Sequence, residues 1–389
     1  MKRIFFYIAG FCCMFNAHAQ MHQYNTNFTL SEKNFVDTVA IEYENDQIYV
    51  PVIIQGKKYR FNLDTGSSQG LLYTDTQIPN LQELGNVISH DANGITDTIK
   101  VVQLPNLMLG HQNINGYVAS IVKKPIGKVN YDGIIGFDIF NKGIGAKIDP
   151  KNKIMILSDR KHYFDHEAGQ TLKYNLKWFV PYIMVSPFMR HTDEVLFDTG
   201  AKQLYQMNRE SFMEHRYKSK QVNAQVEGEA TGNFTVATNS TEKQDKVYFL
   251  NLNRLKWNEF AFKNVRTITT QGASRIGSQL FNYGSIVINP KKKRITFQPY
   301  NNSDSVNVSN KQFGVAFIEK ENQPYIGLIW HKSEAYKNGM RQGDIVLKID
   351  NEPINSYQEF IDYPFTTGKK YKFVLQDPRG FKKEVFVTR

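Results

Sequence analysis

One tripeptide, Asp-Thr-Gly, follows an apolar segment in each half of this chain, and this repeat constrains the fold more than any other feature. The two copies are Asp64, Thr65 and Gly66, and Asp198, Thr199 and Gly200. A single polypeptide therefore carries two equivalent carboxylates. Two carboxylates held close together cannot both ionise at low cost, so they share one proton, and one can act as a general base while the other acts as a general acid.

The repeat extends on both sides of the tripeptide. Upstream, two β-rich segments at 48–54 and 179–185 each carry a proline. Downstream, an apolar-Gly element is followed by a short turn and a strand in both copies. These elements are Ile134, Ile135 and Gly136, and Ile276 and Gly277. Two copies indicate two homologous lobes rather than a solenoid, and alternation of apolar and polar residues predicts an all-β fold. The clearest helix candidate is at 208–217.

In these motifs the chain resembles the pepsin-like and retropepsin-like aspartic proteases, with both lobes in one polypeptide. The resemblance implies two acid-protease β-barrel lobes that form a central cleft, with Asp64 and Asp198 as the catalytic pair. It also implies that Thr65 and Thr199 brace the two loops against each other, and that the apolar-Gly elements support the loops from behind. Arg275 departs from this pattern, because it stands where the family has an apolar residue, and it makes the packing behind Asp198 harder to foresee.

The residues beside the two aspartates are expected to support them. Glycine has no Cβ, so Gly66 and Gly200 let the backbone turn next to the carboxylates. The next positions differ, because one loop has Ser67 and the other has Ala201. A hydroxyl at position 67 could donate a hydrogen bond to the first aspartate and favour its charged form. We therefore expect the shared proton to lie mainly on the second aspartate.

The family closes its active site with a flap hairpin in the first lobe. Residues 90–94, His-Asp-Ala-Asn-Gly, are a plausible tip for such a hairpin. A flap tyrosine is missing from this segment, so how a substrate would be positioned there is left open.

Two other chemistries fit parts of the chain less well. Residues 66–70 match the Gly-x-Ser-x-Gly nucleophile elbow, but that elbow needs a strand, a turn and a helix in an α/β sheet, and here both flanks are β-rich. His162, Asp165 and His166 could share a helical face and bind a metal, yet no third histidine is near them. We expect solvated polar residues there, and neither a metal nor a cofactor.

The C-terminal segment, 311–389, resembles a PDZ domain. Ala335, Gly339, Gly343 and Ile349 carry the more specific spacing, and a helix is expected near 356–363. The carboxylate-binding loop and strand are matched by Phe313, Gly314, Val315, Ala316 and Phe317. Such a domain binds an extended peptide as an added strand and holds its terminal carboxylate with backbone amides. It could recruit or screen substrates, or it could pack as a structural part.

The N-terminus is typical of a secretory signal. Lys2 and Arg3 precede an apolar run at 4–15 and a small-x-small cleavage site at 17–19, so residues 1–19 are predicted to be removed on export. The apolar run is too short to span a membrane. The protein is therefore expected to be periplasmic or secreted.

Composition narrows the function further. Cys12 and Cys13 both lie in the predicted signal, which leaves no cysteine for disulfides or thiol chemistry. The net charge is +11, but the lysines are scattered and are not interleaved with aromatic residues, so a nucleic-acid partner is not expected. Both aspartates lie on one chain, which predicts an active monomer acting on peptide or protein substrates.

The predicted organisation has five parts. These are a signal at 1–19, an N-terminal lobe at 20–160, a C-terminal lobe at 161–300, a linker at 301–310 and the PDZ-like domain at 311–389. Part of 20–45 could be a propeptide, which the sequence leaves open. Two functions fit: an exported aspartic endopeptidase, or a peptide-binding protein on the same fold that no longer hydrolyses.

Overall fold

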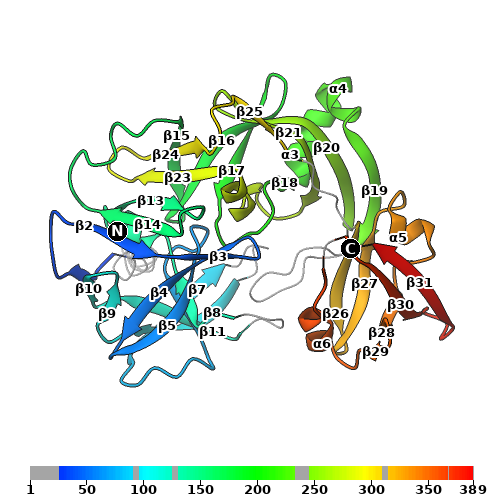
Figure 1. Ribbon diagram of the computed structural model, residues 1–389, viewed down its shortest axis with the longest axis horizontal. Helices are drawn as coiled ribbons and strands as arrows, with labels where there is room; N and C mark the ends of the chain where they lie inside the picture. The colour runs from blue at the N-terminus through cyan, green and yellow to red at the C-terminus, as the bar shows by residue number, and fades with distance from the viewer. Residues whose placement is uncertain are drawn as a thin grey trace, which may run out of the picture.

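The computed structural model describes residues 26–90, 96–124, 130–232, 245–308, 314–366 and 368–388. These residues form three β-sheets and a few short helices, so the prediction of a mostly β protein is confirmed. Figure 1 shows the second lobe above the first and the C-terminal domain to the right of both. None of the helices in the described ranges is long and apolar enough to cross a membrane.

The first lobe is a sheet in which β5 and β12 run parallel beside each other and carry the first aspartate loop. Its strands are β1 (Thr29–Leu30), β3 (Glu42–Glu44), β4 (Gln47–Ile54), β5 (Lys57–Leu63), β6 (Gly70–Tyr73), β7 (Gln82–His90), β8 (Thr96–Gln103), β9 (Leu107–Leu109), β10 (Gln112–Asn115), β11 (Val118–Val122) and β12 (Gly133–Ile135). Helix α2 (Asp138–Asn141) follows β12. The loop at Asp64 thus lies directly between β5 and β6.

The second lobe repeats this order around a long antiparallel pair, β20 and β21. Its elements are β15 (Gln170–Lys177), β16 (Val180–Phe188), β17 (His191–Phe197), β18 (Met207–Asn208), α3 (Arg209–Lys218), α4 (Lys220–Asn223), β19 (Val226–Gly232), β20 (Asp245–Trp257), β21 (Phe260–Thr270), β22 (Arg275–Ile276), η1 (Ser278–Asn282), β23 (Gly284–Asn289) and β24 (Arg294–Pro299). The predicted helix at 208–217 is α3, and Asn208 caps it by accepting from the amide of Ser211 at 2.9 Å.

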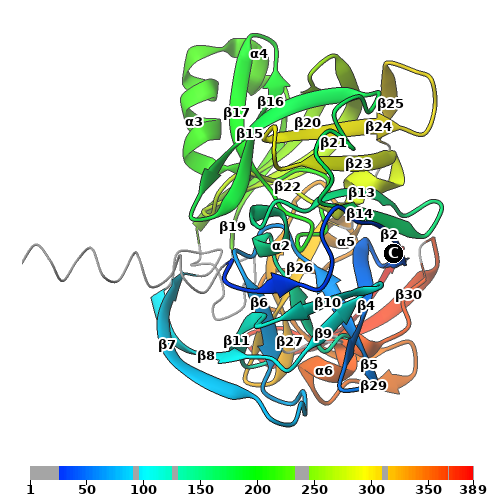
Figure 2. The ribbon, with the colours of Figure 1, turned by 90° about the vertical axis from the view of Figure 1, so that its left-hand side faces the viewer.

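A continuous sheet joins the lobes, as Figure 2 shows at mid-height. Its strands run in the order β2 (Val36–Ala40), β14 (Ile154–Ser158), β13 (Gly145–Asp149), β23, β24 and β15. At its centre Ala146 pairs with Ile288, and Ile148 pairs with Ile286. Equivalent positions of the two copies therefore exchange partners, which places an approximate two-fold axis between the lobes.

The N-terminal segment is built into this architecture. Strand β2 pairs along its whole length with β14, and Phe28, Phe35 and Val39 are buried in the core. The residues from 36 to 40 are therefore a structural strand of the inter-lobe sheet.

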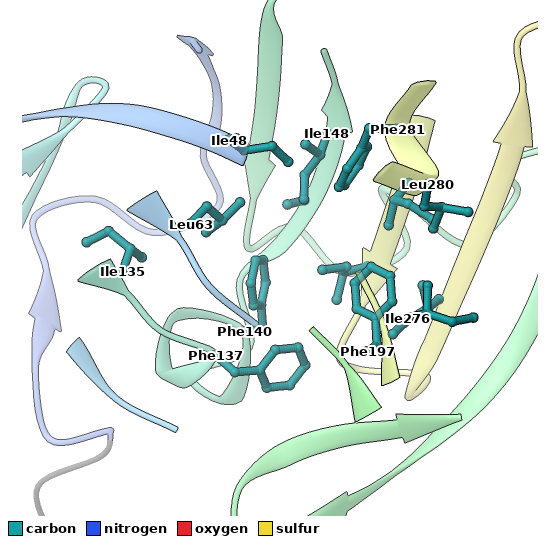
Figure 3. Close-up of a cluster of buried hydrophobic side chains, with 14 of the residues drawn as sticks. Ile48, Leu63, Ile135, Phe137, Phe140, Ile148, Phe197, Ile276, Leu280 and Phe281 are labelled. Carbon is teal, nitrogen blue, oxygen red and sulfur yellow. The ribbon is translucent and has the colours of Figure 1, made fainter. Parts of the chain in front are cut away.

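One apolar core runs beneath both aspartate loops. Figure 3 shows Leu63 and Ile135 of the first lobe close to Phe137 and Phe140, with Phe197 and Ile276 of the second lobe beyond them. Leu63 and Phe197 each directly precede an aspartate and are 1% exposed. Burial of the residue before each aspartate fixes where the two loops begin.

The C-terminal domain has its own sheet and core. Its elements are β26 (Val315–Lys320), β27 (Gln323–Ile329), α5 (Glu334–Lys337), β28 (Ile345–Ile349), β29 (Glu352–Pro353), α6 (Tyr357–Asp362), β30 (Lys370–Gln376) and β31 (Lys382–Thr388). The domain packs on the second lobe, because Leu328 of β27 joins an apolar cluster with Ala230, Val247 and Phe249. Trp330 adds to it by stacking on Phe249 at 5.7 Å between ring centroids.

The segment expected to be a linker, 301–310, contributes a strand instead. Strand β25 (Ser305–Asn307) pairs in parallel with β21, and Val308 after it is 1% exposed. Val306 packs against the same core. The polar residues before β25 suggested a linker, but two alternating valines attach this stretch to the second lobe.

Candidate active site

The structure brings Asp64 and Asp198 together where the lobes meet. Each aspartate follows the last residue of a strand, and its amide donates to the parallel strand of its own lobe, Asp64 to the carbonyl of Ile135 at 3.0 Å and Asp198 to that of Ile276 at 2.9 Å. A hydrogen bond joins the two carboxyl groups. Asp198 is 7% exposed and Asp64 is partly exposed.

The two threonines cross between the loops and form a reciprocal brace. The hydroxyl of Thr65 donates to the carbonyl of Phe197 at 2.6 Å and accepts from the amide of Thr199 at 3.0 Å. The hydroxyl of Thr199 donates to the carbonyl of Leu63 at 2.5 Å and accepts from the amide of Thr65 at 3.0 Å. Both side chains are buried, so these bonds are shielded from water and fix the spacing of the carboxylates.

The glycines are required by the close approach of the two loops. A methyl group on Gly66 would lie 2.6 Å from the carboxyl carbon of Asp198, and one on Gly200 would lie 2.4 Å from that of Asp64. Each glycine amide also donates to the aspartate of its own loop, at 2.8 Å from Gly66 and 3.0 Å from Gly200. The bare backbone of each loop therefore forms one wall around the opposite carboxyl group.

The apolar-Gly elements support both loops in the same way. The amide of Phe137 donates to the carbonyl of Ser67 at 2.7 Å, and the amide of Ser278 donates to that of Ala201 at 2.8 Å. A methyl group on Gly136 or Gly277 would collide with the loop backbone, at 2.6 and 2.4 Å.

A polar side chain completes each support. The buried carboxylate of Asp138 accepts from the amide of Gly70 at 3.2 Å, and the amide oxygen of Gln279 accepts from that of Leu204 at 3.1 Å. Asp138 and Gln279 each lie two residues after the glycine of the apolar-Gly element, so they are equivalent in the two copies of the repeat. The sequence shows this equivalence, but it did not reveal the role of either side chain.

Each lobe also holds the other from outside through an asparagine. Asn141 of the first lobe donates to the carbonyl of Phe179 at 2.8 Å, and Asn282 of the second lobe donates to the carboxylate of Asp46 at 2.9 Å. The contacted residues lie in equivalent hairpin turns. The relative position of the lobes is therefore fixed on both sides of the aspartates.

Electrostatics distinguish the two carboxyl groups. Burial, together with the charge of Asp198, raises the pKa of Asp64 from its ordinary 3.8 to about 8. Asp64 therefore keeps a proton at neutral pH. This reverses the expectation that the proton lies mainly on Asp198.

Ser67 does not act as expected from the sequence. Its hydroxyl donates to the carbonyl of Gln69 at 2.8 Å, and no bond from that hydroxyl to Asp64 is present in the described structure. A carbonyl two residues ahead is within easy reach of a serine side chain, so the local turn captures the donor. The asymmetry between Ser67 and Ala201 is thus not what distinguishes the two carboxyl groups.

Replacing Ser67 by Ala should therefore leave the pH dependence of the site unchanged. The variant loses one hydrogen bond within the turn, and the free energy of unfolding should fall by about 1 kcal/mol. A urea titration measures that change, and a pH profile of kcat/KM checks the first claim. A displaced acid or basic limb would show that Ser67 does act on Asp64.

Arg275 is the residue that most alters the electrostatics of the pair. Its Nη1 lies 3.6 Å from Oδ2 of Asp198, and the two side chains are only 7% and 10% exposed. Sequence reasoning treated this arginine as a disturbance of packing behind the loop, whereas the structure uses it as an ionic partner. Its position in an otherwise apolar element was the signal.

Three tyrosines lie within electrostatic reach of the pair and remain neutral. Burial raises the pKa of Tyr131 to about 12 and also raises the pKa of Tyr73 and of Tyr182. Tyr73 and Tyr131 share a hydrogen bond of 3.1 Å on the first lobe, and Tyr182 lies on β16 of the second. Nothing in the repeat identified them, because tyrosine is common in buried β-strands.

The two weaker chemistries find no support in the geometry. Residues 66–70 run from β5 into β6 without a helix, so the strand, turn and helix of a nucleophile elbow are missing. His162 contacts Asp165 at 2.6 Å, and Asp165 accepts from Asn289 at 3.0 Å. In the described ranges no group of three or more His, Cys, Asp or Glu side chains could hold a metal.

Two other predicted sites are described only in part. Strands β7 and β8 form an antiparallel hairpin where the flap was expected, but residues 91–94 of its tip lie outside the described residues. Phe313 also lies outside them, while Gly314 has a φ of +73°, Val315 to Phe317 lie on β26, and the predicted helix is α6. Beside α6, the ring of Phe317 lies 4.6 Å from that of Phe360.

The chain is similar to known proteins in structure but not in sequence. No protein-family model matches the chain, and no curated protein matches it in sequence. One solved structure to which the chain is similar is the crystal structure of aspartic proteinase from Irpex lacteus. The TM-score is 0.45 at 12% sequence identity, and the match covers 68% of this chain and 97% of that chain.

Proposed function

We propose that this protein is an exported aspartic endopeptidase that hydrolyses peptide bonds with Asp64 and Asp198. One observation carries the proposal: two Asp-Thr-Gly loops, one from each lobe, meet with their carboxyl groups hydrogen-bonded to each other and a threonine brace between them. A symmetric buried pair of this kind is costly, because one carboxyl group must be kept neutral beside an ionised one. Water-activating acid-base catalysis uses that arrangement directly.

The chemistry follows from the charge states of the pair. Asp198 accepts a proton from a water molecule as the water oxygen attacks the peptide carbonyl carbon, and Asp64 donates its proton to the carbonyl oxygen. In the resulting tetrahedral diol the carbon-nitrogen bond breaks. The departing amine takes the proton from Asp198, and a hydroxyl proton of the diol returns to Asp64. Both carboxyl groups end as they began, and no covalent intermediate forms.

A mixed peptide library tests this proposal. The purified chain is incubated with the library across pH, with and without a statine-type inhibitor, which resembles the tetrahedral diol. We expect internal cleavage that the inhibitor suppresses, at a rate per molecule that does not rise with protein concentration, since one chain holds both aspartates. A chain that binds library peptides without cutting them at any pH would be a peptide-binding protein on this fold.

We also propose that the C-terminal domain is PDZ-like and captures peptides along β26. In the described part of the chain this strand ends its sheet and pairs with β27 alone, and α6 lies beside it. Gly314 precedes β26 with a positive φ, so backbone amides there can turn toward a terminal carboxylate. A peptide bound in this way would hold a protein substrate beside the catalytic lobes.

Peptides with a free or an amidated C-terminus test this second part. Because the domain packs on the second lobe, its deletion would expose apolar side chains, so the full chain is the better reagent. We expect the amidated peptide to bind about tenfold more weakly or worse, as loss of a charge-assisted hydrogen bond implies. The free peptide should also inhibit cleavage of a protein more than cleavage of a short peptide. Equal binding of both peptides would make the domain a structural part.

A further inference from the structure

Arg275 occupies a special place in the repeat. It lies on β22 and pairs with Leu196, two residues before Asp198, as Ile134 on β12 pairs with Asn62, two residues before Asp64. One lobe therefore has an isoleucine and the other an arginine at the same position beside the aspartate strand. The two lobes match closely in their braces and glycines, and this position is one at which their charge differs.

The arginine is held firmly in that place. Its amide donates to the carbonyl of Gln206 and its carbonyl accepts from the amide of Gln206, both at 2.9 Å. Its Nε donates to the carbonyl of Ala273 at 3.4 Å, and its Nη1 faces Asp198 at 3.6 Å. A guanidinium that is only 7% exposed is costly to bury without an ionised partner. The partner available at this distance is the carboxylate of Asp198.

The other groups that face the pair do not compete for this charge. Tyr73 and Tyr131 from the first lobe and Tyr182 from β16 are neutral, because burial raises the pKa of each phenol. Tyr182 in turn lies within the electrostatic reach of Lys177 and Glu194, whose opposite charges form an ion pair with each other. The charges that decide the state of the site are thus Asp64, Asp198 and Arg275.

We propose that Arg275 is a positioning residue that holds Asp198 in its ionised form, so that the shared proton stays on Asp64. The proposal rests on the proposed function, because it assigns the base and the acid of the same pair. It makes Asp198 the group that activates water. It also means that the two lobes have different roles despite their similar loops.

The consequence for pH dependence has a definite sign. A nearby cation makes each proton of the pair easier to remove, so its loss makes both protons harder to remove. Without Arg275, the singly ionised pair forms only at higher pH, and the doubly ionised pair also forms only at higher pH. Both limbs of the pH profile of kcat/KM should therefore move upward, the acid limb by about one pH unit or more.

Three variants of the full chain test this. Arg275→Ile installs the residue of the other lobe, and Arg275→Lys keeps the charge. The control Arg266→Met removes an arginine of β21 that forms an ion pair with Glu227 of β19 at 3.4 Å. We expect an upward shift of both limbs in Arg275→Ile, return of most of the shift in Arg275→Lys, and the wild-type profile in Arg266→Met. Unmoved limbs in Arg275→Ile, or equal shifts in the isoleucine and lysine variants, would overturn the proposal.

A measurement without substrate separates this proposal from the proposed function. Carbon-13 NMR of protein labelled at the aspartate carboxyl groups follows the protonation of both residues, with signals assigned from Asp64→Asn and Asp198→Asn. In the wild type, Asp198 should stay ionised while Asp64 titrates, and in Arg275→Ile both signals should report a shared proton. That result in a chain that cleaves nothing would retain the role of Arg275 and reject the peptidase. If the protein cleaves peptides but the NMR titration is the same in wild type and Arg275→Ile, the peptidase would be retained and the role of Arg275 rejected.

Discussion

Asp64→Asn is expected to reduce kcat/KM for peptide hydrolysis by a factor of at least about 10²–10⁴. This is the usual contribution of a positioned acid or base. The amide has the shape of the protonated carboxyl group but cannot deliver a proton to the substrate. The protein should stay folded, because Asp64 is already neutral over most of the pH range. Cleavage of a fluorogenic peptide chosen from the library experiment measures the loss.

The same substitution should change how stability depends on pH. The pKa of Asp64 is about 8 in the folded protein and 3.8 in an ordinary setting, so its neutral form is favoured by folding. A group whose folded pKa is raised contributes stability that is fully present below the ordinary value and is lost as pH rises through the folded value. The free energy of unfolding of the wild type should therefore fall between about pH 4 and pH 8, relative to Asp64→Asn.

Urea titrations of both proteins at several pH values check this expectation. Parallel curves of unfolding free energy against pH would show that Asp64 does not retain its proton. Substantial residual cleavage by Asp64→Asn would independently reject it as the acid of the pair.

Asp198→Asn should behave differently, because it removes activity and stability together. The substitution leaves the buried guanidinium of Arg275 without its carboxylate, and breaking a buried ion pair from one side costs roughly 3–5 kcal/mol. Asp64→Asn carries no such penalty. The difference between these two conservative substitutions is the largest stability effect that we expect at this site.

The double variant Asp198→Asn with Arg275→Ile is the matched control. It removes both charges and gives the second lobe the apolar residue that the first lobe has in Ile134. We expect it to recover most of the stability lost in Asp198→Asn and none of the activity. If Asp198→Asn and Asp64→Asn are equally stable, the ion pair contributes little to stability. If the double variant is less stable than Asp198→Asn, Arg275 has other partners.

The repeat allowed much of the site to be predicted from the sequence. Asp-Thr-Gly after a buried strand is a local pattern, and two copies of it predicted two equivalent loops and a pair of carboxylates. The brace between Thr65 and Thr199 was expected only from the resemblance to the aspartic proteases. The short helices after Gly136 and Gly277 could likewise be placed, because glycine and the change of periodicity are local signals. Such features depend on residues that are close in sequence.

The distribution of charge could not be predicted in this way. Whether the hydroxyl of Ser67 reaches Asp64 or Gln69 depends on the conformation of one turn, and both acceptors are close to it in sequence. The role of Arg275 depends on a side chain that crosses from β22 to a loop far away in the chain. The strand at 305–307 was missed because polar residues precede it, although its valines carry the pattern of a strand.

The pairing of β13 with β23 at the centre of the inter-lobe sheet also bears on how the protein is made. During synthesis the first lobe emerges complete with β13, yet the outer edge of that strand has no partner until residues 284–289 have left the ribosome. An exposed edge strand readily pairs with other chains. The edge strand β13 itself carries apolar residues that are buried in the complete protein, such as Ala146 and Ile148. A first lobe produced alone would keep its edge open indefinitely and should self-associate through it.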